Sequence, residues 1–265
     1  MKILLSLSAL LITLTLTAQS NTATWYLNDT SMDGIQSPTS TASGTYSTAM
    51  GNYTTASGSY STAMGTYTTA LGYNSTAMGL TSTASGEYST AMGYSTTASD
   101  YNSLVVGRYN LLGSTVTNSA TSFSTSNTAF VIGNGTANDS RSDALTVLFD
   151  GTTTIAGDLS INSDARLKAN IISLGSTLAK LLQIDGKTYT MKKDENKKQK
   201  IGVLAQDIEK VFPELVSESN GVKSVNYQGL VPVLINALKE QDKKLNKQQV
   251  EIDELKAIVT KLITP

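Results

Sequence analysis

The sequence predicts a mainly β N-terminal part, built as a parallel β-solenoid, followed by a small α+β domain that ends in a long coiled-coil helix. Three observations lead to this fold class. Glycine recurs every seven residues between Gly44 and Gly107, except at Asp100. Most charged residues follow Asn162, whereas Glu87 is the only one within residues 34–99. The C-terminal residues carry an apolar heptad pattern. The chain is therefore modular, with two parts of different construction.

The N-terminus has the pattern of a secretory signal. A lysine at position 2 precedes an apolar run over residues 3–16, which is thinned by Ser and Thr, and small residues follow at Thr17-Ala18. This run is too short to cross a bilayer as a stable helix. We expect residues 1–18 to be a signal peptide cut after Ala18, residues 19–39 to be a linker, and the protein to be secreted or at the cell surface. No later stretch is long and apolar enough to predict a membrane span in the mature chain.

The composition excludes several kinds of chemistry. The chain contains no cysteine and no histidine, which removes disulfides, the common zinc sites, thiol nucleophiles and every histidine-based triad. The net charge of −1 gives no basis for nucleic-acid binding. We therefore expect no cofactor, no metal and no nucleic-acid partner. Any catalysis must use a base other than histidine.

The glycine repeat indicates a solenoid and not a helical heptad. Gly, Ser and Thr occupy most positions between the glycines, and these residues disfavour helix interiors. Glycine suits turns and the Thr-rich stretches between suit short strands. The residue before each glycine alternates mainly between Ser and Met, so two seven-residue halves form one coil of 14 residues. Alanine occupies the same position of each seven-residue unit from Ala42 to Ala98, and threonine occupies the position before it from Thr48 to Thr97.

Residues 40–109 resemble the head repeats of the trimeric autotransporter adhesins (YadA-like), whose runs of the type Ser-x-Ala-Ile-Gly have this spacing. The resemblance implies a left-handed parallel β-roll in each of three chains. It leaves open whether the repeats are a scaffold or an adhesive head with a host-surface or matrix ligand. The tyrosines two residues after glycine, such as Tyr46 and Tyr60, are either a contact stripe or a cover for the turns, and we favour a cover.

A third interpretation of the repeats is an ice-binding solenoid, in which stacked threonines on a flat outward face order water. This interpretation requires the threonines to face outward. Their register with the inward-facing position of the adhesin repeat predicts that they turn inward instead.

Residues 110–161 are expected to form a β-rich neck or shaft. The runs Phe130 to Gly135 and Ala144 to Gly151 look like short strands that end in glycine turns. The segment is similar to neck regions of phage tail-fibre-like proteins, which implies that it joins the roll to the domain that follows.

The sequence Asn162-Ser163-Asp164-Ala165-Arg166-Leu167-Lys168 opens the charged part of the chain. Without histidine or cysteine, only a carboxylate or a lysine can activate a serine hydroxyl here, and lysine acts as a base when burial lowers its pKa. Lys168 lies five residues after Ser163, within reach across a turn. The spacing alone leaves an ordinary polar turn as the alternative.

Further blocks follow in order: residues 202–208 (GVLAQDI), 211–216 (VFPELV) and 225–227 (VNY). Together with the Ser163 block they resemble the C-terminal intramolecular chaperone of phage endosialidases and tail spikes. The resemblance implies that residues 162–229 direct trimerisation and then cut the chain as an autocatalytic serine endopeptidase. It implies Ser163 as nucleophile, Lys168 as general base and Asn162–Ser163 as the scissile bond. Asp164 and Arg166 match the motif too and set the turn. The alternative is a fibre whose dyad is inert and whose chaperone stays in place as a cap.

Residues 230–265 are predicted to form one long helix with an apolar seam. The a positions are Val231, Leu238, Leu245, Ile252 and Val259, and the d positions are Leu234, Gln241, Gln248, Leu255 and Leu262. The two glutamines weaken the seam at some cost in stability. A helix of this length is not stable alone, so it needs partner helices. We expect a homotrimer.

Overall fold

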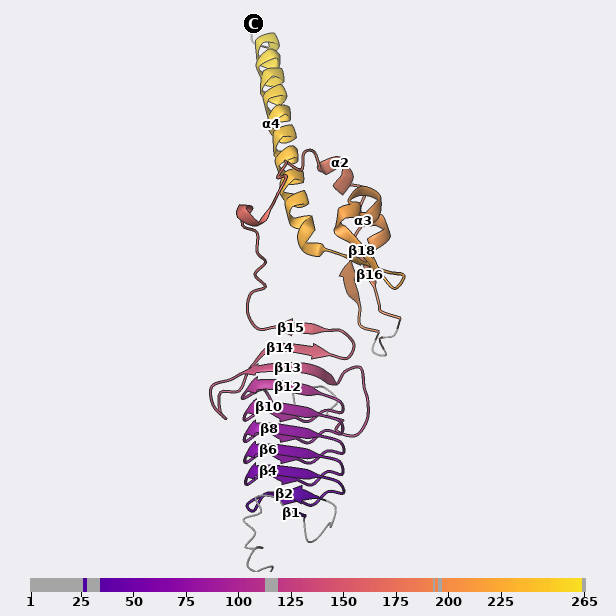
Figure 1. The fold of residues 1–265 in the computed structure, drawn as a ribbon. Helices are drawn as coiled ribbons and strands as arrows, with labels where there is room; N and C mark the ends of the chain where they lie inside the picture. Colours follow the sequence, from indigo (N-terminus) through magenta and orange to yellow (C-terminus); the bar gives the residue numbers. More distant parts are fainter. Residues whose placement is uncertain (1–25, 28–33, 113–118, 193, 195–196, 264–265) are drawn as a thin grey trace, which may run out of the picture. The chain divides into compact units, whose positions relative to one another are not determined.

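The computed structural model describes residues 26–27, 34–112, 119–192, 194 and 197–263 (Figure 1). It divides into two compact units, residues 1–161 and 162–265, which are described separately. The predicted signal peptide lies outside the described residues, and so do residues 19–25 and 28–33 of the predicted linker.

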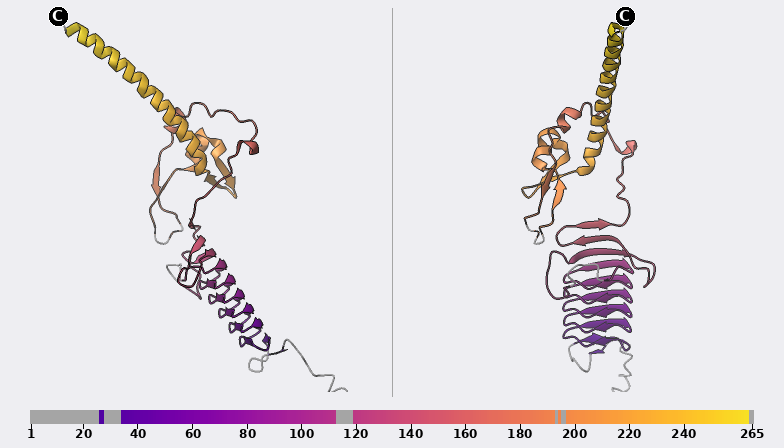
Figure 2. Two further views of the ribbon diagram at one scale, coloured as in Figure 1. Left: turned by 90° about the vertical axis from the view of Figure 1, so that its left-hand side faces the viewer. Right: turned by 180° about the vertical axis from the view of Figure 1, so that it is seen from behind.

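The first unit is the predicted β-solenoid of about five coils (Figures 1 and 2). One sheet stacks seven parallel strands: β2 (Ile35–Gln36), β4 (Thr48–Asn52), β6 (Thr62–Thr66), β8 (Thr76–Leu80), β10 (Thr90–Tyr94), β12 (Leu104–Arg108) and β13 (Thr128–Asn134). The antiparallel strands β1 (Tyr26–Leu27), β14 (Asp143–Leu148) and β15 (Thr153–Ile155) complete it. A second sheet stacks β3 (Thr41–Ala42), β5 (Thr55–Ala56), β7 (Thr69–Ala70), β9 (Thr83–Ala84) and β11 (Thr97–Ala98). Equivalent residues 14 apart pair directly, as Thr48 does with Thr62. The predicted 14-residue coil is confirmed.

The solenoid has a thin interior made of alanine. Every alanine of the repeat from Ala42 to Ala98 is completely buried, and Val105 and Val131 continue the column. One methyl group per half coil removes little apolar area from water. The coils therefore depend on the backbone hydrogen bonds between their stacked strands.

Both kinds of glycine allow close stacking of the coils, because a Cβ on either Gly51 or Gly72 would meet a carbonyl oxygen of the next coil, and one kind is required for a second reason. Gly51 and its equivalents lie in the long strands with a φ of 101° to 128°, where residues other than glycine are strained. Gly72 has no positive φ, but a Cβ there would come within 2.0 Å of the Gly86 carbonyl oxygen in the next coil. Gly72 and its equivalents begin turns, because the Gly72 carbonyl accepts a hydrogen bond from the Ser75 N–H, whereas Gly51 and its equivalents lie within strands. The prediction that glycine supplies a turn at every seventh position is therefore wrong for the Gly51 set.

The left-handed turn positions belong mainly to tyrosine, two residues after each glycine. Tyr46 and Tyr60 have φ values of 54° and 59°, and their exposed rings pack together with centroids 5.4 Å apart. Where Asn74 takes this position, Tyr73 just before it carries the ring instead, 5.5 Å from that of Tyr60. The rings thereby form a continuous tyrosine column: Tyr46, Tyr60, Tyr73, Tyr88 and Tyr101.

The threonines of the repeat face outward, which contradicts the sequence-based expectation. Thr48 and Thr62 are partly exposed, whereas the alanine after each is completely buried. Successive side chains of a strand point to opposite faces, so a residue next to an inward alanine must point out. The buried hydroxyls belong instead to the position before these threonines, as at Ser47 and Thr54. The structural objection to an ice-binding face is thereby removed.

Asn110 closes the end of the second sheet by imitating another strand. Its Oδ1 accepts a hydrogen bond from the Thr97 backbone N–H at 2.7 Å, and its Nδ2 donates to the Thr97 carbonyl at 3.0 Å. Nδ2 also donates to the Leu111 carbonyl at 2.8 Å. These bonds occupy backbone groups of β11 that the next coil would otherwise pair with.

Replacing Asn110 with alanine should therefore destabilise the solenoid. The change leaves backbone groups at the end of the sheet without these partners, at a cost of about 1–3 kcal/mol for each buried group. We expect a fall of roughly 3 kcal/mol in the free energy of unfolding, measured by urea denaturation of the full chain followed by circular dichroism. Asn52→Ala, at an exposed position in β4, is the control and should change it by less than about 0.5 kcal/mol. Equal effects of the two variants would contradict the capping role.

The second unit is the predicted small α+β domain with a long final helix. In chain order it contains α2 (Leu178–Leu181), the hairpin of β16 (Lys187–Tyr189) and β17 (Lys200–Gly202), α3 (Ala205–Val211), the hairpin of β18 (Val216–Ser219) and β19 (Val222–Val225), and α4 (Leu230–Ile263). Its core is formed by Ile208, Val211, Phe212 and Val233. The N-terminal end of α4 is thus part of the domain.

Most of α4 has no partner within the chain. Among its residues only Val233 and Ala237 are buried. The apolar side chains at the predicted a and d positions are 45–80% exposed along the whole helix. The seam therefore lies on a face that the domain does not cover. Within the described residues, no helix has the length and apolar character needed to cross a membrane.

Candidate functional site

The predicted catalytic residues lie in an extended stretch at the start of the second unit. Residues 156–176, here called the linking segment, run from the end of the first unit into the second and contain no strand or α-helix (Figure 2). They are exposed throughout. The one regular feature is a single 3₁₀ turn over Ala165–Leu167. Apolar side chains are exposed as well: Leu167 by 71% and Ile172 by 88%. The segment therefore has a local shape at the turn but no cover from its own chain.

Asp164 and Arg166 build this turn, as the sequence predicts. One carboxylate oxygen of Asp164 accepts a hydrogen bond from the Arg166 backbone N–H at 2.9 Å and caps the turn. The Arg166 guanidinium donates to both carboxylate oxygens, through Nε at 3.1 Å and Nη2 at 2.6 Å. These bonds lower the pKa of Asp164 and raise the pKa of Arg166. Both side chains are thus occupied with the turn and do not reach Ser163.

The turn brings Ser163 and Lys168 together. The Lys168 backbone N–H donates to the Ala165 carbonyl at 3.1 Å, which reverses the chain so that Lys168 Nζ donates to Ser163 Oγ at 2.7 Å. The dyad is therefore formed by local structure alone. A lysine acts as a base only after it loses its proton, and burial is the effect that favours this loss. Both side chains are exposed in the single chain.

Contacts at the far end of the linking segment are not predicted by the sequence. The Glu240 carboxylate, on α4, accepts hydrogen bonds from Ser176 Oγ at 2.6 Å, from the Thr177 N–H, and from the Leu178 N–H at 3.2 Å. Asn236 Nδ2 donates to the Gly175 carbonyl at 3.2 Å. These partners are more than 60 residues apart along the chain, and no spacing pattern marks them.

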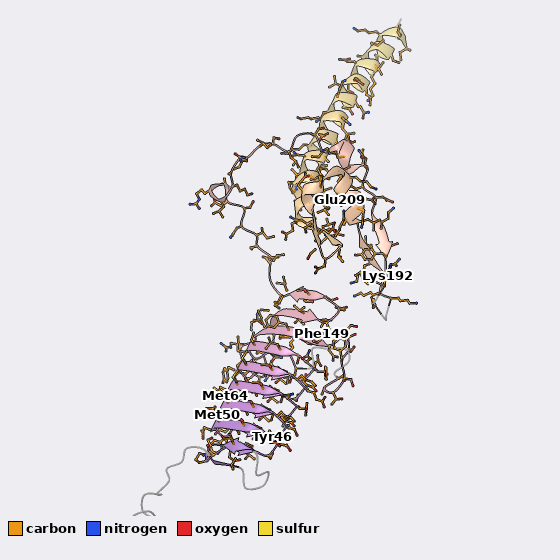
Figure 3. The ribbon with its side chains drawn as sticks, turned by 45° about the vertical axis from the view of Figure 1, so that its right-hand side comes forward. Tyr46, Met50, Met64, Phe149, Lys192 and Glu209 are labelled. Atoms are coloured by element: carbon orange, nitrogen blue, oxygen red, sulfur yellow. The ribbon has the colours of Figure 1, made fainter. Side chains whose placement is uncertain are left out.

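An outer face of the solenoid is a second candidate surface. On the large sheet, the side chains on both sides of each buried alanine point outward, so methionine and threonine form two parallel rows. Met50 pairs with Met64 in the next coil (Figure 3). The methionine row is Met50, Met64, Met78 and Met92, and Val106 and Ile132 continue it. These methionines are partly exposed, and we call this the methionine face.

Comparison with known families identifies both parts of the chain. Residues 42–68, 70–96 and 84–110 match the YadA head domain repeat. Residues 163–217 match the family described as chaperone of endosialidase, and the match begins at Ser163.

The chain is also similar to two curated phage proteins. It is 33% identical over 112 residues to the long tail fiber protein Gp37 of Salmonella phage S16. The alignment covers 38% of this chain and 15% of that protein. It is 31% identical over 100 residues to the long tail fiber protein Gp37 of Escherichia phage AR1, covering 34% of this chain and 9% of that protein. The matches thus span only a small part of each relative. The chain carries YadA head repeats in its solenoid and, over residues 163–217, a match to the chaperone of endosialidase.

Proposed function

We propose that the protein is a secreted trimeric fibre whose C-terminal domain directs assembly and then releases itself by cutting the Asn162–Ser163 bond. The observation that supports this most directly is the 2.7 Å contact between Lys168 Nζ and Ser163 Oγ. The contact supports the assignment of Lys168 as the base for Ser163 at the first peptide bond of the chaperone-like unit.

Two uncovered apolar surfaces support a homotrimer. The seam of α4 is exposed over five heptads, and an isolated helix with such a seam is stabilised by partner helices. The methionine face offers a second row of apolar groups on the solenoid. The similarity to long tail fibre proteins and to YadA head repeats agrees with a fibre of several chains that works outside the cell.

The proposed cleavage proceeds in two steps, an N-to-O acyl shift followed by hydrolysis of an ester. Lys168 takes the proton of Ser163 Oγ, which attacks the carbonyl carbon of Asn162. The C–N bond of Asn162–Ser163 then breaks, and Lys168 passes the proton to the departing amine. The product is an ester between Asn162 and the Ser163 side chain. Water hydrolyses this ester, which leaves a carboxylate on Asn162 and a free amine on Ser163. Each chain reacts once, on itself.

Exposure of the dyad explains how assembly controls cleavage. In one chain the linking segment is fully exposed, so Lys168 lacks the burial that a lysine base requires. Packing of the other two chains against this segment supplies the burial. Cleavage therefore follows correct assembly, and the fibre that has lost its chaperone is kinetically trapped. The head is then free to act as a scaffold or to bind a host-surface or matrix ligand.

Intact mass and solution mass of the purified full chain test this proposal. We expect two products, one ending at Asn162 and one beginning at Ser163, with the N-terminal product a trimer. A chain that stays whole while trimeric would instead be a non-cleaving fibre with its chaperone retained as a cap.

The outward threonines favour one further candidate, an ice-binding face on the second sheet. Thr41, Thr55, Thr69, Thr83 and Thr97 lie in register on consecutive strands of this sheet. If the face orders water, millimolar protein should separate the freezing and melting points of ice, and Thr69→Tyr should abolish the gap. Coincident freezing and melting points would exclude this function.

A further inference from the structure

We propose that Glu240 is a positioning residue that fixes the linking segment to the coiled-coil helix, so that trimerisation of α4 sets the position of the Ser163–Lys168 dyad. This inference rests on the proposed self-cleavage. It concerns a residue that makes no contact with the dyad.

The contact is a three-part clamp on one side of α4. The carboxylate of Glu240 binds the Ser176 hydroxyl and the two backbone N–H groups that follow it. One turn earlier, Asn236 holds the Gly175 carbonyl. Two turns earlier, the Val233 carbonyl accepts a hydrogen bond from the buried Thr177 hydroxyl at 2.9 Å. Four successive residues, 175–178, are thereby tied to one stretch of helix.

The heptad register places this clamp away from the helix seam. With Leu238 at a, Glu240 occupies c, and Val233 also occupies c, whereas the partners of a trimer would pack on a and d. Position c lies two residues, or about 200°, around the helix from a. The same part of α4 can therefore hold its own linking segment on one side and two partner helices on the other.

The clamp is the first fixed point after the dyad along the chain. All residues from Lys168 to Ser176 are exposed, and only the last two reach the helix. Lys168 lies seven positions before Gly175, so its backbone can lie at most about 25 Å from the clamp. Once three helices are in register, this tether confines each dyad to a zone near the outer face of the helix bundle, where the exposed Ile171 and Ile172 can meet a neighbouring chain.

The hydrogen bonds of the clamp also favour the ionised form of the Glu240 carboxyl, which is the form that accepts all three of them. The bonds from Ser176 and Thr177 lower the pKa of the Glu240 carboxyl below its ordinary value. An ionised carboxylate has enough acceptor sites for all three donors, whereas an alanine has none. Removing it should free the end of the linking segment without disturbing the seam.

The test compares Glu240→Ala and Glu240→Gln with Glu254→Ala. Glu254 occupies position c two heptads later, is exposed, and lies far beyond the linking segment. We expect Glu240→Ala to form trimers but to cleave at least about 10-fold more slowly, a barrier change of about 1.4 kcal/mol. Glu240→Gln, which keeps one carbonyl acceptor, should be intermediate. Glu254→Ala should cleave at the wild-type rate.

Amide hydrogen exchange measures whether the clamp is intact, independently of the cleavage reaction. In a Ser163→Ala background, Glu240→Ala should speed amide exchange at Thr177 and Leu178, and Glu254→Ala should not. The positioning role would be overturned if Glu240→Ala trimers exchanged faster but still cleaved at the wild-type rate. If the alanine variant fails to fold, the same result in Glu240→Gln trimers would overturn it. If the wild-type chain itself stays whole, the self-cleavage proposal fails and takes the positioning role with it, and the exchange data then describe only a structural contact.

Discussion

Ser163→Ala should abolish cleavage and leave a full-length trimer. The hydroxyl is the nucleophile in the proposed reaction, and loss of a nucleophile from a catalytic dyad lowers the rate by at least about 1,000-fold. The side chain is exposed and its one hydrogen bond within the described structure is to Lys168, so the fold should not change. Intact mass of the purified protein, followed over days, measures the effect. Ser160→Ala, in the same exposed segment, should cleave normally.

Lys168→Arg distinguishes a base from a structural partner. Arginine keeps the positive charge and can still donate to Ser163 Oγ, but it does not lose its proton in proteins. We therefore expect Lys168→Arg to be as inactive as Lys168→Ala. If the arginine variant cleaves at the wild-type rate, Lys168 holds Ser163 in place and another group takes the proton. If Ser163→Ala cleaves, the dyad assignment is wrong.

Ile252→Asp should prevent both trimerisation and cleavage. Ile252 is an a residue in the middle of the α4 seam and is 45% exposed in the single chain. In a trimer the change would bury three like charges against one another, at a cost of several kcal/mol for each. We expect monomers at concentrations where the wild type is trimeric, by analytical ultracentrifugation. Cleavage should fall with the trimer, because the dyad then stays exposed.

Val250→Asp is the matched control for this variant. Val250 lies two residues away at position f, outside the seam, and is 57% exposed. It should remain a trimer and cleave. Trimeric, fully cleaved Ile252→Asp would show that α4 does not drive assembly, and equal losses in both variants would point to damage to the helix itself.

The sequence by itself determined the features that depend on local periodicity. The spacing of Gly44 and its equivalents dictates a 14-residue coil, because close stacking of the coils leaves no room for a Cβ. The heptad after Gly229 predicts the long helix, and the block from Ser163 to Lys168 predicts the turn that joins its two ends. In each case the interacting residues are close in sequence or repeat at a fixed interval, so the sequence pattern is enough to predict the local structure.

The tertiary structure alone decided the features that depend on distant residues or on the direction of a side chain. Thr48 faces outward because Ala49 faces inward, and the repeat is equally regular in either orientation. Asn110 caps β11 across 13 residues, and Glu240 holds Thr177 across 63. Such pairs meet only after the chain has folded, and they do not recur at a fixed interval, so no periodic pattern in the sequence predicts them.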